Sequence, residues 1–109
     1  MRIGKVIGTV TCSRLHPSLV GGRFKIVVPL STTLLAAECR GDESAINGAN
    51  AEPIVIYDQL GAGMGHAVAI SEGAEATMPF QPEKKPVDSY CSAILDTIRL
   101  DPDMIPPSR

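Results

Sequence analysis

The residues whose types and spacing could support chemistry lie in the stretch LGAGMGHAV, residues 60–68. Gly61, Gly63 and Gly65 stand at alternating positions, and His66 follows directly. A glycine-rich run can hold a phosphate with its backbone N–H groups, form a tight turn, or let another chain approach closely. Nucleotide-binding loops place a helix after their glycines, whereas the following HAVAISEG has the pattern of a strand. The stretch therefore predicts a structural turn.

The remaining reactive side chains do not form a recognised catalytic or metal-binding motif. A zinc site would need the two histidines, His16 and His66, to combine with cysteines or carboxylates, and we find no such motif. No nucleophile elbow G-x-S-x-G is present. Asp58 and Glu72 flank the glycine run, and we interpret them as solvated carboxylates at strand ends. We expect no catalytic residues, no metal and no cofactor.

Composition limits the possible classes further. The chain has 109 residues, with ten basic and twelve acidic side chains and a net charge of -2, so it lacks the basic character of a nucleic-acid binder. Its three cysteines include no C-x-x-C pair, which fits free thiols in a reducing cytoplasm. We interpret Cys12 and Cys91 as small buried hydrophobes. No apolar run is long enough for a membrane span, so we expect no membrane partner.

Four segments have the character of short strands. They are RIGKVIGTVTCS near the N-terminus, FKIVVPL, EPIVIYDQL and HAVAISEG. Gly4 and Gly8 in the first segment predict bends or close backbone contacts. Pro29 should mark an edge or the end of the second strand, because proline donates no hydrogen bond to a sheet. The glycine run lies between the last two strands.

The segments between and after these strands are more varied. TTLLAAECRG fits either a short strand or one or two helical turns, GDESAINGAN a surface loop, and ATMPFQPEKKP an extended crossing. In PVDSYCSAILDTIRL, six apolar residues recur at i, i+3, i+4, i+7, i+8 and i+11, which predicts an amphipathic helix. These residues are Val87, Tyr90, Cys91, Ile94, Leu95 and Ile98.

Together the elements predict a mostly-β chain. We expect a small closed β-barrel resembling the oligonucleotide-binding fold, with a short C-terminal helix, because closure removes exposed strand edges. The expected boundaries are one barrel domain over residues 1–100 and an irregular tail over residues 101–109. Such a barrel also allows an oligonucleotide-binding or ligand-binding module as an alternative. Against it, two of the four aromatic residues, Phe24 and Tyr90, fall on predicted core faces.

Three segments in the same order resemble the EutN/CcmL family of bacterial microcompartment vertex proteins, over most of the chain to about Ile98. The first is MRIGKVIGTVTCSRLHPSLVGGRFKIVVPL, with I-G-K-V before a loop containing P-S-L. The second is YDQLGAGMGHAVAISEG, with D-x-x-G-A-G-x-G from Asp58 to Gly65. The third is KPVDSYCSAILDTI, which opens with P-V-D.

The resemblance implies a structural shell protein and not an enzyme. It implies a homopentamer that closes the corners of a polyhedral shell built mainly from hexameric shell proteins. The glycine turn, with Gly61, Gly63, Gly65 and His66, would then allow subunits to pack closely. This family usually has an acidic residue where this chain has His66, so the pH response of the ring should differ, since a histidine's reference pKa is about 6.5.

Overall fold

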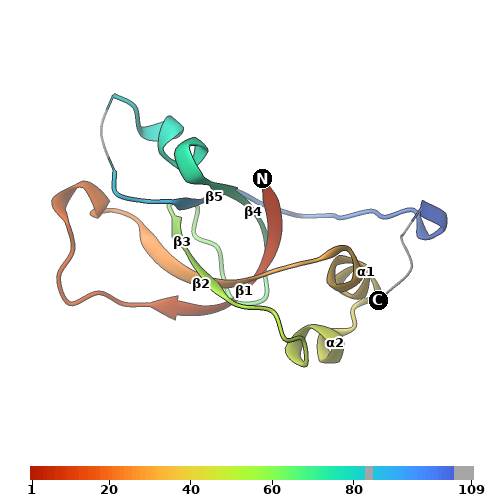
Figure 1. Cartoon of the computed structure of the whole chain (residues 1–109). Helices are drawn as coiled ribbons and strands as arrows, with labels where there is room; N and C mark the ends of the chain where they lie inside the picture. The colour runs from red at the N-terminus through yellow and green to blue at the C-terminus, as the bar shows by residue number, and fades with distance from the viewer. Residues whose placement is uncertain (83–84, 105–109) are drawn as a thin grey trace.

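The computed structural model describes residues 1–82 and 85–104, which form a closed five-stranded β-barrel with short helices attached (Figure 1). The strands are β1 (Arg2–Val10), β2 (Arg23–Pro29), β3 (Ile54–Asp58), β4 (Ala67–Glu72) and β5 (Ser89–Ile94). The helices are α1 (Thr32–Arg40) and α2 (Glu43–Asn47), with 3₁₀ segments η1 (Pro17–Leu19), η2 (Gly73–Phe80) and η3 (Pro102–Met104). The prediction of a mostly-β chain built on a small closed barrel is confirmed.

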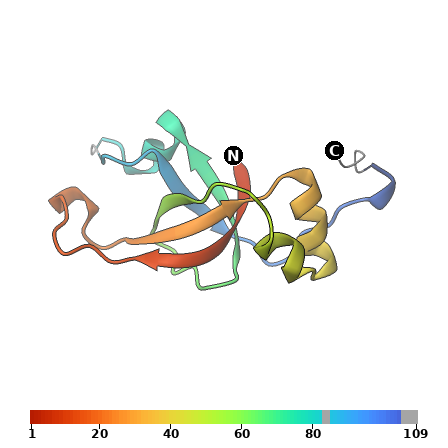
Figure 2. The ribbon, with the colours of Figure 1, turned by 60° about the horizontal axis from the view of Figure 1, so that its bottom comes forward.

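Neighbouring strands follow the order β1–β2–β3–β5–β4 around the barrel. The β3–β5 pair is parallel and the other pairs are antiparallel. The register between β1 and β2 shifts between Val6 and Gly8, which is where a bulge bends a strand. Residues 2–5 of β1 pair with β4, and residues 4–10 pair with β2, so the second half of β1 pairs with β2 alone. The β1–β2 hairpin therefore projects from the barrel (Figure 2).

Side chains fill the interior of the barrel. Each of the following is at most 1% exposed: Val6, Val27, Ile56, Ala62, Val68, Ile70 and Cys91. The predicted close contact at Gly4 is confirmed, because a Cβ there would lie 2.7 Å from Ile70 Cδ1 and 3.1 Å from the Val28 oxygen. These packed side chains make the barrel interior the hydrophobic core of the described residues.

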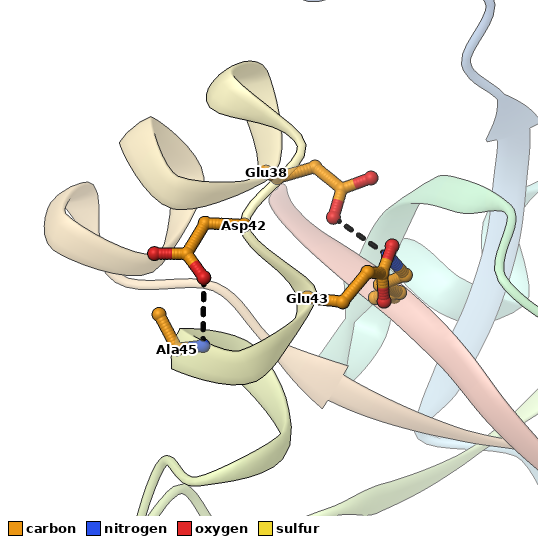
Figure 3. Close-up of polar contacts among 5 residues, drawn as sticks. Glu38, Asp42, Glu43 and Ala45 are labelled. Carbon is orange, nitrogen blue, oxygen red and sulfur yellow. Dashed lines mark hydrogen bonds and ion pairs between the residues drawn. The ribbon is translucent and has the colours of Figure 1, made fainter.

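Between β2 and β3, two short helices pack against the barrel. Ser31 begins α1 by accepting a hydrogen bond from the Leu34 N–H, and Gly41, with φ of 74°, ends it. Asp42 begins α2 by accepting from the Ala45 N–H at 3.2 Å (Figure 3). The sequence left α1 open between strand and helix. Its prediction of a loop over GDESAINGAN is wrong for α2, which buries Ile46.

The predicted C-terminal helix is wrong. Ser89–Ile94 is strand β5, and Val87, Leu95 and Ile98 lie outside any helix. Of the six predicted stripe residues, Cys91 is fully buried, whereas Ile94 is 38% exposed. The six side chains therefore do not form one buried helical face. The physical reason is barrel closure: without β5, β3 and β4 would each present an unpaired edge, and pairing both outweighs a weak helical preference.

The segment after β4 also differs from its prediction. The predicted extended crossing ATMPFQPEKKP covers residues 76–86, and its first five residues belong instead to the 3₁₀ segment η2. Glu83 and Lys84, in the same predicted segment, lie outside the described residues. Phe80 of η2 packs edge-on against both Tyr57 and Tyr90, and Tyr57 contacts Phe24 at 5.6 Å between ring centroids. All four aromatic residues thus form one packed cluster.

Candidate functional site

The glycine turn, residues 58–66, connects β3 to β4 and is organised by a buried carboxylate. Asp58 is 1% exposed, and its two oxygens accept hydrogen bonds from the Leu60 N–H at 2.8 Å and the Ala62 N–H at 2.7 Å. Ala62 is itself in the core. The interpretation of Asp58 as a solvated strand-end carboxylate is therefore wrong, because this group shapes the turn from inside. Glu72, by contrast, forms an ion pair with Arg2.

The three glycines have different roles within one subunit. Gly61 and Gly65 have φ of 83° and 80°, a region that L side chains rarely adopt. Gly63 has no positive φ, and a Cβ there would meet His66 at 3.4 Å, which is ordinary contact. No atom of the described subunit lies within 4 Å of the Cβ positions of Gly61 and Gly65. The fold of one subunit therefore explains two of the glycines by backbone angle and leaves Gly63 unexplained.

His66 completes the turn through its ring. The ring Nδ1 accepts a hydrogen bond from the Gly63 backbone N–H at 2.9 Å, and the His66 backbone N–H donates to the Gly63 backbone oxygen at 3.1 Å. Because a backbone N–H always donates, Nδ1 must be unprotonated in this arrangement. Two further backbone bonds, from Gly65 N to Val6 O and from Val6 N to His66 O, join the end of the turn to β1. The turn is thus continuous with the barrel.

The turn also presents apolar side chains to solvent. Met64 is 65% exposed and Leu60 is 49% exposed. On the outer face of the barrel, Ile7 of β1 and Val55 of β3 are 45% and 47% exposed. Single exposed apolar residues are common, but these four are among the largest exposed apolar groups of the subunit.

An ionic cluster that the sequence did not predict joins the helices to the barrel. Lys5 of β1 is 5% exposed, and its Nζ donates to Glu38 Oε2 of α1 at 2.9 Å and to Glu43 at the start of α2. Figure 3 shows the two glutamates converging on the same point. Burial opposes the charge on Lys5, but the hydrogen bonds that it donates to Glu43 and Glu38, together with their negative charges, outweigh burial and raise the lysine pKa.

A local signal for this arrangement exists in the sequence. Ser31 and Gly41 bracket a segment of helical length, and Asp42 can begin a second helix directly after it. Such caps would have placed Glu38 and Glu43 on helices. Nothing in the sequence says that both would meet Lys5.

The reactive side chains do not converge on a catalytic centre. Among residues 1–82 and 85–104, no group of three or more His, Cys, Asp or Glu side chains is placed to hold a metal ion. Cys91 is buried as expected, whereas Cys12 is exposed, so its interpretation as a buried hydrophobe is wrong. Burial, followed by the charge of Asp58, raises the pKa of the Cys91 thiol to about 12, which makes it a poor nucleophile.

The geometry gives little support to the nucleic-acid alternative. Base-stacking surfaces need exposed aromatic faces, but Tyr57 is 1% exposed and its hydroxyl donates to the Leu19 oxygen. The other three aromatic rings pack against one another or against Tyr57.

Within the described residues, no helix is both long and apolar enough to cross a bilayer.

The comparison with known proteins decides the family. The family model described as "Ethanolamine utilisation protein EutN/carboxysome" matches residues 1–96. The chain belongs to the EutN/CcmL family. The match covers the whole barrel and the glycine turn and ends shortly after β5.

Individual members of the EutN/CcmL family match nearly end to end. The carboxysome shell vertex protein CcmL of Gloeobacter violaceus is 32% identical over 105 residues, covering 93% of this chain and 88% of the relative. The microcompartment shell vertex protein PduN of Salmonella typhimurium is 30% identical over 100 residues, covering 90% and 98%. The structure of the GrpN pentameric microcompartment shell protein from Rhodospirillum rubrum matches with a TM-score of 0.69 at 28% identity, covering 93% of this chain and all of that chain.

Proposed function

We propose that this chain is a structural vertex protein of a bacterial microcompartment shell, where it forms a homopentamer. The observation that carries the proposal is the family match over residues 1–96, with vertex and pentameric shell proteins among the relatives that it resembles over most of their length. A flat layer of hexameric shell proteins can close into a polyhedron where fivefold units interrupt it. The chain would supply those units, and its partners would be hexameric shell proteins.

The filled barrel supports a structural role. Its interior is packed with aliphatic side chains, and its buried ionisable groups serve the fold: Asp58 holds the glycine turn and Lys5 holds the helices. Function must therefore reside on the outer surface, as a shell component requires. Since a closed ring repeats one head-to-tail contact, two different patches of each subunit must meet.

We assign the glycine turn to one of those patches. Gly63 is the glycine that neither a positive φ nor crowding inside the subunit requires, and it lies beside the exposed side chain of Met64. A neighbouring subunit packed against the turn would explain why position 63 has no side chain. Gly61, Gly65 and His66 then hold that surface in shape.

The test is the mass of the assembled protein at near-neutral pH. Native mass spectrometry should give a dominant species at about 57.5 kDa, five chains of 11.5 kDa each. Co-expression with a hexameric shell protein should give closed particles, and omitting this chain should give open sheets or tubes. A monomer under conditions where the barrel is folded would refute the homopentamer. Salt-sensitive binding of single-stranded DNA would instead support the nucleic-acid alternative.

A further inference from the structure

The β1–β2 hairpin carries an open cleft of about 440 Å³ where it leaves the barrel, here called the hairpin cleft. Its apolar walls are Val10, Leu15 and Phe24, and two cationic side chains, Arg23 and Lys25, stand beside them. A cleft of this composition fits an extended segment that carries both apolar side chains and carboxylates.

The two cations of the hairpin cleft have no carboxylate partner among the described residues. The ion pairs found among the described residues are made by Arg2, Lys5 and Arg40 instead. None of the twelve acidic residues lies in residues 1–37, so the hairpin carries no acid of its own. Asp58 is paired in register with Arg23, but both of its oxygens already accept backbone N–H groups.

A segment with the complementary character leaves the other end of the barrel. Residues 96–104, here called the arm, consist of an extended stretch after β5 followed by η3, and they lead away from the hairpin (Figures 1 and 2). The arm carries three aspartates and one arginine. Asp101 and Asp103 are exposed, and Met104 is 77% exposed. Its apolar residues Ile98 and Leu100 alternate with charged neighbours, as in a strand with one face to bury.

We propose that the arm of one subunit docks into the hairpin cleft of the next subunit around the ring. The proposal rests on the homopentamer proposed above and names its second contact. The hairpin and η3 lie at opposite ends of a molecule that measures 46 × 26 × 24 Å (Figure 1). The arm therefore cannot fill the cleft of its own subunit, and the pairing joins two copies head to tail.

Reach and chemistry agree with this pairing. The six arm residues before η3 span at most about 20 Å when extended, and the three residues of η3 add about 6 Å. This reach matches the 24 Å width of the molecule, so the end of an arm can contact an adjacent subunit. Docking would bring Asp101 and Asp103 to Arg23 and Lys25 and would cover the exposed Met104. It would also give every subunit one arm donated and one arm received, which is what a closed ring requires.

Charge exchange tests the contact. The cleft variant Arg23→Glu/Lys25→Glu and the arm variant Asp101→Lys/Asp103→Lys should each weaken the ring by about tenfold or more in subunit dissociation constant, measured by native mass spectrometry over a dilution series. The combined fourfold variant reverses both charges and should restore assembly at least in part. Arg40→Glu, an exposed cation outside the cleft, is the matched control and should assemble as the original chain does.

A covalent test uses Cys12, which lines the cleft and is exposed. In a Cys39→Ser background, Asp103→Cys should cross-link to Cys12 of another subunit when treated with a short bis-maleimide. Denaturing gels should then show a ladder that ends at five chains, and the Cys39→Ser parent should show none. Circular dichroism establishes that each variant is folded.

The outcomes separate this contact from the proposed function. If the original chain is a monomer, the homopentamer itself fails. If the original chain is a pentamer but both charge variants assemble normally, or the cross-linked ladder is absent, the pentamer stands and the arm contact is refuted. If the arm variant keeps the pentamer and loses only its co-assembly with a hexameric shell protein, the arm binds the neighbouring tile, which also overturns the proposal.

Discussion

Replacing Lys5 with methionine should destabilise the chain by removing the one cation that two glutamates share. The Lys5 side chain is 6% exposed, and Glu38 and Glu43 are 20% and 62% exposed. Methionine keeps the apolar stem but leaves the two carboxylates facing each other without a counter-charge. The substitution should therefore weaken the contact between the two helices and the barrel and lower the free energy of unfolding.

The size of the loss follows from the exposure of each partner. Breaking a fully buried ion pair by deleting one partner costs about 3–5 kcal/mol, because the remaining charge stays desolvated. Here Glu43 can turn to solvent and Glu38 is partly hydrated, so about 2 kcal/mol is expected for Lys5→Met at neutral pH. The measurement is urea unfolding followed by far-ultraviolet circular dichroism, at one fixed subunit concentration because assembly shifts the midpoint.

Two comparisons make the result diagnostic. Adding Glu38→Gln and Glu43→Gln to Lys5→Met removes the stranded charges and should recover most of the lost stability. Arg40→Met removes an exposed cation 3.9 Å from Asp42 and should cost less than about 1 kcal/mol. The reasoning is refuted if Lys5→Met costs no more than Arg40→Met, or if neutralising both glutamates recovers nothing.

The pH dependence of this loss has a definite sign. The pKa of Lys5 is raised above its ordinary value of 10.5 in the folded protein, so folding favours the protonated lysine. Its contribution is fully present below about pH 10.5 and is lost as the pH rises through the raised pKa. The stability difference between the original chain and Lys5→Met should therefore shrink in strongly alkaline solution and be constant around neutral pH.

Three further predictions concern the thiols and the glycine turn. Because burial and then Asp58 raise the pKa of Cys91 to about 12, a thiol reagent at pH 8 should modify the two exposed cysteines quickly and Cys91 only after unfolding. Gly61→Ala places a side chain at φ of 83° and should cost about 1–2 kcal/mol in urea unfolding, whereas Gly63→Val should leave subunit stability nearly unchanged and reduce the pentamer seen by native mass spectrometry.

The strands with alternating patterns were predictable because each buries one face in the barrel. EPIVIYDQL and HAVAISEG correspond to β3 and β4, and β2 ends at the proline that the sequence marked. The final strand was predicted as a helix because the apolar residues around Tyr90 and Cys91 fit both a helical stripe and a short strand. Local spacing cannot tell that two unpaired edges, of β3 and β4, await a fifth strand.

In the glycine turn too, the local sequence predicts the turn itself, whereas contacts with the rest of the barrel decide which side chains are buried. Its position between two strands, and a role for glycine in turning the chain, follow from the sequence, and positive φ at Gly61 and Gly65 agrees with that. The buried state of Asp58 does not follow, since a carboxylate beside a turn is normally solvated. Its burial depends on the two N–H groups that fold back onto it and on a barrel end that excludes water there.

Closure of the barrel also limits how copies of this chain can associate. Every strand has a neighbour on both sides for at least part of its length, which leaves little edge for another chain to extend the sheet. The exception is the second half of β1, which lies in the hairpin and pairs with β2 alone. Subunit contacts must come from side chains on the outer face and from the segments that leave the barrel. Those segments are the glycine turn, the β1–β2 hairpin and the arm, and the last two carry opposite charges at opposite ends of the molecule. A ring held by the contacts proposed above should be sensitive to charge at Arg23, Lys25, Asp101 and Asp103 and to a side chain at Gly63, and should tolerate changes on the rest of the outer surface.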